Sequence, residues 1–286
     1  MRKTALLLIP LTLVLGACNS GSQPASSSGE ANQDTMPATP DNVITGTVQL
    51  QPGVARAKSI SSNAKLELTL EDISQQPSVP IANKTIQPLG QFPVSFRLEF
   101  NPNRVVPDDI LIIVADITDG DRRYTMPLQQ QVLTKGKPSE VSINLIPEPT
   151  ASEKMLAAFR ELQGQLGGMK ISKGTSLGEH SSRAWQIFKK NNHVQFVVDI
   201  EDNFDTNGRT RSDYAYKDGK PWVVIRKDMK KAGATPSSIE RAGWGSDGDL
   251  VLNEVEANGK TSKMSQRDVR SLHSDAEAMF NKAGGK

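Results

Sequence analysis

The stretch Lys65-Leu66-Glu67-Leu68-Thr69-Leu70 decides the fold of the first half of the chain. Polar and apolar residues alternate strictly in this stretch, as they do again in Phe96-Arg97-Leu98-Glu99-Phe100. A period of two places every second side chain on the same face of an extended strand, so that one face is buried and the other meets water. Both stretches are therefore predicted to be half-buried β-strands.

Similar short apolar runs recur between Val43 and Pro147. Turn residues such as Gln51-Pro52-Gly53 and Asn101-Pro102-Asn103 separate these runs. About seven short strands with regular turn signals in roughly 105 residues are typical of two antiparallel sheets packed face to face. The predicted fold of residues 43–147 is an all-β sandwich.

Several of these runs also carry a family resemblance. The resemblance is carried by Ile44-Thr45-Gly46-Thr47-Val48, Leu66–Ser74, Pro93–Leu98 and Ala115-Asp116-Ile117. Over about residues 43–147 the chain resembles the YbaY/YscW-type lipoprotein family. The resemblance implies a β-sandwich behind a lipidated N-terminus. It also implies a pilotin-like role, since some members escort secretin subunits to the outer membrane. The matching residues are strand and turn positions, so the resemblance assigns no site residue.

The N-terminal residues predict where the protein is located. Arg2 and Lys3 precede an apolar run from Ala5 to Leu15, which is too short to span a bilayer, since spanning takes roughly 20 residues. Residues 1–17 are therefore predicted to be an export signal. Leu15-Gly16-Ala17-Cys18 resembles the bacterial lipobox, in which the cysteine becomes a diacylglyceryl cysteine carrying acyl chains such as palmitate. The alternative is a plain secretory signal whose cysteine is incidental.

Cys18 is the only cysteine of the chain and is the predicted lipid attachment site. Two or three acyl chains hold a protein durably on a membrane. Asn19 follows Cys18, and in such lipoproteins an aspartate there would favour the inner membrane. The expected location is the outer membrane of a Gram-negative envelope, facing the periplasm. Residues 18–42 are rich in Ser, Gly and Pro and are predicted to be a flexible tether.

A second domain is predicted for residues 151–286. Pro147-Glu148-Pro149-Thr150 marks the boundary, because the residue before a proline is kept out of the helical region. Ser152 is expected to cap a helix that ends at Gly167-Gly168, and Ser265 to cap a helix that ends near Lys282.

Turn dipeptides between these helices indicate a meander. Asn207-Gly208 and Asp218-Gly219 supply the positive φ angles that two-residue hairpins require. The strands are expected near residues 183–189, 193–200, 209–217, 221–227, 239–245, 249–255 and 260–264. The predicted fold is an α+β domain with an antiparallel meander sheet flanked by helices, and it resembles no family known to us.

Acidic and histidine residues are candidate metal ligands. One predicted hairpin contains five residues with oxygen ligands, Asp199, Asp202, Asp205, Asn207 and Asp213. The glycine and the closing glutamate of a calcium loop are not at the required offsets from them. His180, His193 and His273 belong to different predicted elements and lack metal-ligand spacing. We therefore expect solvated turn chemistry, with no metal and no cofactor.

A catalytic site is not expected either. The sequence contains no G-x-S-x-G elbow, and the one cysteine is assigned to lipid attachment. The open alternative is a glycosidase-like carboxylate pair, with Asp199 and Glu201 beside Asp213 and Glu254. The catalytic residues are therefore predicted to be none, and the binding residues stay unassigned.

Two further features have competing interpretations. The basic run Arg226–Lys231 is predicted to be a solvated loop, with contact to anionic lipid or cell-wall polymer as the alternative. Trp185, Trp222 and Trp244 are predicted to be core residues, although an exposed Trp244 would mark a contact surface.

The leading functional hypothesis is a non-enzymatic, outer-membrane-anchored lipoprotein that binds or chaperones envelope proteins. One alternative is a cell-wall-directed enzyme or enzyme inhibitor that acts through residues 151–286, with residues 231–238 as the inhibitory loop. Another is a structural spacer of the envelope. A formal net charge of +2 gives no indication of nucleic-acid binding, so the expected partners are the membrane, through Cys18, and an envelope protein.

Overall fold

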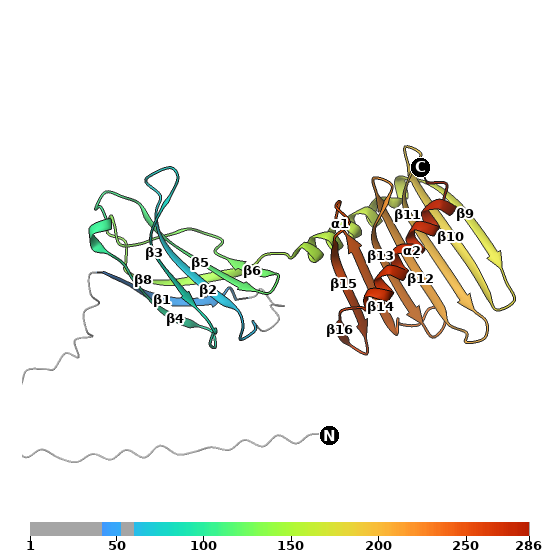
Figure 1. The fold of residues 1–286 in the computed structure, drawn as a ribbon, viewed down its shortest axis with the longest axis horizontal. Coiled ribbons are helices and arrows are strands. Elements are labelled where there is room, and N and C mark those ends of the chain that lie inside the picture. Colours follow the sequence, from blue (N-terminus) through green and yellow to red (C-terminus); the bar gives the residue numbers. More distant parts are fainter. Residues whose placement is uncertain (1–41, 53–59, 286) are drawn as a thin grey trace, which may run out of the picture. The chain divides into compact units, whose positions relative to one another are not determined.

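The computed structural model describes residues 42–52 and 60–285 of the chain (Figure 1). The predicted export signal at 1–17, the lipid attachment site Cys18 and the tether up to residue 41 lie outside the described residues. In the described part, no helix is long and apolar enough to cross a membrane. This part contains two β-rich regions, each built on strands of its own.

The described residues between 42 and 147 form a β-sandwich. Its strands are β1 (Val43–Leu50), β2 (Lys65–Asp72), β3 (Val79–Ile86), β4 (Val94–Glu99), β5 (Leu111–Asp119), β6 (Arg122–Thr125), β7 (Gln130–Gln131) and β8 (Glu140–Pro147), with a 3₁₀ turn at Pro102–Arg104. One sheet holds β1, β4 and β8, the other holds β2, β3, β5, β6 and β7, and a short β6–β8 pairing joins them. The predicted all-β sandwich is confirmed.

The core of the sandwich follows from the alternation in its strands. Leu66, Leu68 and Leu70 of β2 are fully buried, while the side chains between them reach intermediate or exposed positions. They pack with Leu98 of β4 and Ile113 of β5 in one apolar cluster. A strand that buries one face against a second sheet is stabilised by roughly 25 cal/mol for each Å² of apolar surface removed from water.

One strand pairing departs from the prediction of two antiparallel sheets. β1 and β8 run parallel, with Gly46 opposite Val141. The two strands come from opposite ends of the sandwich sequence, and parallel neighbours are joined by long connections instead of hairpins. The turn signals in the sequence report hairpins only, so they carried no information about this pair.

Long basic side chains donate hydrogen bonds to backbone carbonyls at both edges of the sandwich. The two terminal nitrogens of Arg104 donate to the carbonyl oxygens of Ile81 and Pro80 on β3, at 2.9 and 2.8 Å. Lys84 of β3 donates through Nζ to the carbonyl oxygen of Arg97 on β4, at 2.8 Å. These bonds occupy edge carbonyls that would otherwise be free to accept a foreign strand.

The second region is a meander sheet with two helices. Its strands are β9 (Lys170–Leu177), β10 (Ser181–Lys190), β11 (His193–Asn203), β12 (Arg209–Lys217), β13 (Lys220–Met229), β14 (Ser238–Trp244), β15 (Leu250–Ala257) and β16 (Lys260–Ser262). They pair in sequence order, each antiparallel to the next. Helices α1 (Ala151–Gln165) and α2 (Gln266–Lys282) flank the sheet, and Leu166–Gly168 forms a 3₁₀ turn. The predicted α+β class is confirmed.

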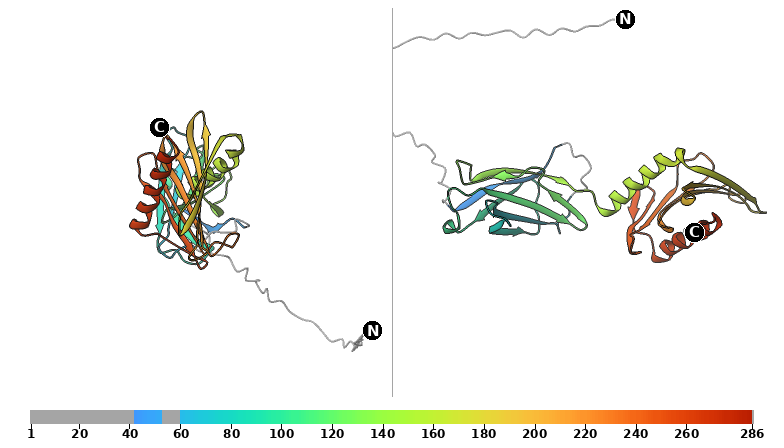
Figure 2. Two further views of the ribbon diagram at one scale, coloured as in Figure 1. Left: turned by 90° about the vertical axis from the view of Figure 1, so that its right-hand side faces the viewer. Right: turned by 90° about the horizontal axis from the view of Figure 1, so that it is seen from above.

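The two helices cover opposite faces of this sheet (Figure 2). Val197 packs in the cluster that contains Leu272 of α2, whereas its neighbour Val198 packs in the cluster that contains Phe159 of α1. The central strands are therefore buried on both faces. We call the two sides the α1 face and the α2 face.

Two parts of the second region differ from the sequence expectation. Strand β9 was not predicted, because nearly all its side chains are exposed and it shows no apolar alternation. The basic run at 226–231 is not a loop throughout, since Arg226 to Met229 belong to β13. Strand geometry sends the alternate side chains of such a run to opposite faces, so it does not form one basic patch.

Thr150 caps α1, where Ser152 was expected. The Thr150 hydroxyl accepts the Glu153 N–H at 3.2 Å, and the Glu153 carboxylate accepts the Thr150 N–H at 3.0 Å. This reciprocal pair is a capping box, which requires an extended first residue and a glutamate three positions on. Ser152 already lies inside the helix. For α2 the expected cap is confirmed, because Ser265 accepts the Asp268 N–H.

Candidate functional site

The α2 face of the second sheet carries a charged hollow of about 420 Å³. It is lined by residues of β10 to β14 and by Asp275 of α2, among them Arg183, Asp199, Glu201, Arg226 and Glu240. Acidic residues outnumber basic residues in this lining. The hollow therefore combines both charges with a net negative balance.

Arg226 is the centre of the charged hollow. Its guanidinium donates to the Asp275 carboxylate of α2 and lies 3.9 Å from the Glu240 carboxylate on β14. Burial raises the pKa of Glu240, and the nearby Arg226 opposes this rise only in part. An upward pKa shift caused by burial is enriched at functional sites.

Asp199 is fixed on the same face by Arg183. The Arg183 Nε donates to both carboxylate oxygens of Asp199, at 2.8 and 3.0 Å, and the Asp199 side chain is nearly fully buried. A buried carboxylate is stable in such a position only when it is paired and hydrogen-bonded. Asp199 is therefore a structural ion-pair partner.

The four carboxylates of the open catalytic alternative do not converge. Asp199 pairs across the strands with Ser212, whereas Asp213 pairs with Val198, so the two aspartates point to opposite faces. Glu201 lies two residues from Asp199 on the α2 face. Glu254 lies two residues from Leu252, a member of the α1 cluster, and so belongs to the α1 face with Asp213.

The α1-face carboxylates also have cationic or polar partners. Asp213 accepts from Nε of Arg211 at 2.9 Å and from the Gln163 amide of α1 at 3.4 Å. Glu254 lies 3.9 Å from Arg241 on the neighbouring strand. Cross-strand charge pairs of this kind stabilise a sheet. This arrangement lacks the facing acid and base that a glycosidase-like pair requires.

The acidic residues of the β11–β12 hairpin are likewise paired. Asp202 binds Nε and a terminal nitrogen of Arg209 at 2.6 and 2.7 Å, and Asp205 lies 3.2 Å from Nδ1 of His180. His273 lies against the Trp244 ring, with ring centroids 4.7 Å apart. Among the described residues, no group of three or more His, Cys, Asp or Glu side chains could hold a metal ion.

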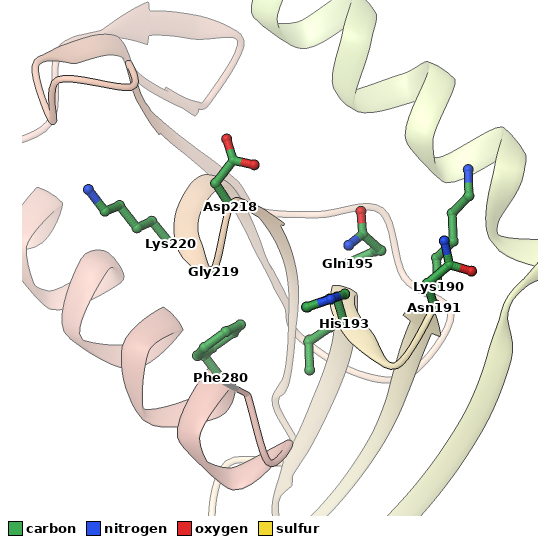
Figure 3. A pocket seen from close by; sticks show the side chains of 9 residues that line it. Lys190, Asn191, His193, Gln195, Asp218, Gly219, Lys220 and Phe280 are labelled. Atoms are coloured by element: carbon green, nitrogen blue, oxygen red, sulfur yellow. The ribbon is translucent and has the colours of Figure 1, made fainter.

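A second hollow, of about 630 Å³, lies at the tips of two hairpins (Figure 3). Figure 3 shows Phe280 of α2 on one side of it and Lys190 with Asn191 at the other, with His193 and Gln195 between them. The turns Asn191-Asn192 and Asp218-Gly219 have positive φ angles at all four residues, as such hairpins require. The lining contains two lysines, Lys190 and Lys220, and one aspartate, Asp218. The charge of this hollow therefore suits an anionic ligand better than a cationic one.

Sequence reasoning named little of either hollow. It singled out His193, Asp199 and Glu201 and placed Arg226 in a basic run, but it missed Glu240 and Asp275. The signal that was available for Arg226 and Glu240 was strand alternation, because both residues are directly opposite each other in β13 and β14. Asp275 joins them through α2, which sequence spacing does not reveal.

The tryptophans are core residues to different degrees. Trp244 is buried in the α2-face cluster, which confirms the prediction for this residue. Trp185 is half-buried and lies under the Lys282 ammonium group, 3.3 Å from the ring centroid. Trp222 is also half-buried and packs against the α1-face cluster.

The family match of this chain lies in the sandwich and the residues just before it. Residues 39–145 match the model of the family described as type III secretion system lipoprotein chaperone (YscW). A curated relative, the uncharacterized lipoprotein YbaY of Escherichia coli (strain K12), is 29% identical over 148 residues, which are 49% of this chain and 75% of YbaY. The structure of an alternative pilotin from the type II secretion system of Vibrio cholerae covers 37% of this chain and 96% of its own, with 23% identity and a TM-score of 0.34.

The family match and the curated relative confirm the resemblance of this region to the YbaY/YscW-type, pilotin-like lipoproteins. The match ends within β8, at residue 145. It therefore describes the sandwich and says nothing about the charged hollow or the hairpin-tip hollow.

Proposed function

We propose that the protein is an outer-membrane lipoprotein, anchored through Cys18 and facing the periplasm, that binds or escorts another envelope protein without catalysing a reaction. The observation that carries this proposal is the YscW match at residues 39–145, which follows a lipobox-like Leu15-Gly16-Ala17-Cys18 after a short polar stretch. The family is described as one of lipoprotein chaperones, and the relative YbaY is a lipoprotein.

The anchor is tested by fractionation. The full chain is expected to label with radioactive palmitate and to separate with outer-membrane markers, because acyl chains are the proposed attachment. Cys18→Ser should lose the label and move to the soluble periplasmic fraction. Palmitate incorporation into Cys18→Ser, or a membrane position that does not change, would contradict the proposed anchor.

The partner is tested by site-specific crosslinking from the sandwich. Leu128 is 80% exposed in the loop between β6 and β7, so a photo-reactive residue placed there reports contacts without disturbing the core. An equivalent residue at Glu161, exposed on α1, is the control in the second region. Capture of the same envelope protein from position 128 and not from position 161 is the expected result. Equal capture from both positions, or none in living cells, would argue against a pilotin-like sandwich.

The absence of catalysis is tested at the charged hollow. Purified Cys18→Ser protein incubated with peptidoglycan is expected to release no sugar or peptide fragments, because Asp199, Asp213 and Glu254 are paired and the carboxylates lie on two faces of the sheet. Fragments released by this protein but not by Glu240→Gln would overturn the non-enzymatic proposal. Glu254→Gln, a change on the opposite face, is the matched control.

A further inference from the structure

Strand β9 forms one edge of the meander sheet and is eight residues long. It pairs with β10 on one side, and on its outer side the described residues provide no hydrogen-bond partner for its backbone. The edge carbonyls of β3 and β4 are bonded by Arg104 and Lys84, and β16 has only three residues. Proteins normally shorten or cover edges because free backbone groups attract another strand. An eight-residue open edge is therefore a pairing surface.

The free backbone groups of β9 can be identified from its hairpin with β10. The Gly178 N–H donates to the Ser181 carbonyl oxygen at 2.8 Å, which makes these two residues a hydrogen-bonded pair. Hydrogen-bonded and non-bonded pairs alternate in an antiparallel ladder. The groups of Ser176, Gly174 and Ser172 are therefore directed to β10. The outward groups belong to Ile171, Lys173, Thr175 and Leu177.

The side chains of the outward residues share the α1 face. Ile171 is opposite Phe188, a member of the α1-face cluster, and alternation places Leu177 on the same side. Ile171 is 46% exposed and Leu177 is 80% exposed. Two large apolar side chains thus mark the two ends of the open edge.

We propose that β9 pairs antiparallel with β9 of a second copy of this chain, about a two-fold axis at Gly174. In this register Ile171 is opposite Leu177 of the other copy, and Lys173 is opposite Thr175. Every outward residue then forms a hydrogen-bonded pair with an outward residue, and the two exposed apolar side chains cover each other. The result is one continuous sheet across both copies.

The register follows from self-complementarity. A shift of the centre to Lys173 would place the two Lys173 side chains directly opposite each other, and like charges in that position destabilise a sheet. It would also leave Leu177 without an outward partner. Gly174 lies on the axis without a side chain, because a Cβ there would meet the Trp185 ring at 2.4 Å. The strand therefore fits its own copy in a specific alignment, which is the argument for a second copy as the occupant.

Cysteine pairs test the register directly. The double variant Ile171→Cys/Leu177→Cys is made in the full chain with Cys18→Ser, so that the only thiols are the introduced ones and the result does not depend on lipid anchoring. Directly opposite residues in a hydrogen-bonded pair have Cα atoms about 5.5 Å apart, within the range of a disulfide. Within one copy the two positions are roughly 20 Å apart along the strand, so an internal disulfide cannot form.

Mild oxidation is expected to convert the double variant into a covalent dimer, while each single variant gives at least tenfold less dimer. Equal crosslinking of the single variants would indicate random collision and overturn the proposal. A double variant that stays monomeric at concentrations of tens of micromolar overturns it too. Disulfide capture of a different protein in cell extract, without self-crosslinking, would assign the edge to that protein and not to a second copy.

Proline substitutions provide the matched control. Thr175→Pro removes an outward N–H that β10 does not use, so the dimer fraction of the double variant should fall at least tenfold with an unchanged melting temperature. Ser176→Pro removes an N–H bonded to β10, so it should lower the melting temperature. A dimer that survives Thr175→Pro in a folded protein would contradict pairing through β9.

Discussion

The sandwich and the meander sheet bury their apolar side chains in different ways. The sandwich folds two sheets over one apolar cluster, and alternate residues of β2, β4 and β8 are buried on one face. The meander is one sheet with a separate cluster on each face, and each cluster is closed by one helix. The sandwich core therefore depends on strands far apart in the sequence, whereas the meander depends on α1 and α2 at its two ends.

The same difference appears at the edges. Long basic side chains bond three edge carbonyls of the sandwich, whereas the outer backbone groups of β9 have no partner among the described residues. A single sheet always has two edges, and here the helices cover its faces and not its ends. The meander is therefore the region from which a second copy can be recruited, and the sandwich is the region that resembles known lipoprotein chaperones.

The largest expected effect comes from removing α2. A chain that ends after Met264 lacks Leu272, Ala276 and Met279, which close the α2-face cluster. Its calorimetric trace should keep the transition of the sandwich and lose that of the meander. A chain that ends after Gly284 keeps α2 and serves as the control. Loss of both transitions would contradict the predicted independence of residues 43–147 and 151–286.

Glycine substitutions compare how tightly the two regions are packed. A Cβ at Gly46 would lie 2.0 Å from the Val141 carbonyl oxygen, and this backbone atom cannot move without breaking the β1–β8 pairing. Gly46→Ala should lower the free energy of unfolding of the sandwich by roughly 3 kcal/mol or more. At Gly243 the nearest atom is the Met155 sulfur, which belongs to a flexible side chain, so Gly243→Ala should lower that of the meander by about 1 kcal/mol.

Urea unfolding with region-specific fluorescence measures both values. Gly90→Ala is the control in the sandwich, because a Cβ there has no atom within 4 Å. It should change the free energy of unfolding by less than about 0.5 kcal/mol. Equal losses at Gly46 and Gly243 would show that rigid backbone contact does not distinguish the two regions.

The helix cap predicts a smaller effect, confined to the meander. Thr150→Ala removes the hydroxyl that accepts the Glu153 N–H and should destabilise α1 by about 1 kcal/mol. Ser152→Ala lies inside the helix and should change stability by less than about 0.5 kcal/mol. Thermal melts of the two variants settle the position of the cap. A larger loss for Ser152→Ala would restore the cap expected from the sequence.

The smallest effect concerns acid stability. The hydrogen bonds from Arg209 hold the pKa of Asp202 below its ordinary value. Because the pKa is lower in the folded state, the stabilisation is present above the unfolded pKa of about 3.9 and is lost as the pH falls through the folded value. Asp202 and Arg209 are about a third exposed, so the stabilisation should be less than about 1 kcal/mol.

Melting temperatures between about pH 5 and pH 2 measure this contribution. Asp202→Asn should lose less stability on acidification than the unchanged chain, and Asp218→Asn in an exposed turn should follow the unchanged chain. Identical acid profiles for Asp202→Asn and the unchanged chain would show that the ion pair contributes nothing to the meander.

The sequence determined the local features of both regions. Alternation in Lys65–Leu70 defined β2 and its buried face, and the dipeptide Asp218-Gly219 defined the β12–β13 turn. The same local information defined the Ser265 cap of α2. Strand period, turn geometry and helix caps involve residues within a few positions of each other, and such contacts can be read from spacing alone.

The contacts between distant segments follow from the three-dimensional packing and not from local spacing. The parallel β1–β8 pair, the edge strand β9 and the two helix-covered faces have no local signature. The same holds for the candidate site. The sequence identified Asp199 as a candidate residue, but the Asp199–Arg183 and Arg226–Asp275 contacts each join two different elements. These interactions depend on which faces meet after collapse, and a one-residue shift in strand register moves every side chain of the strand to the opposite face.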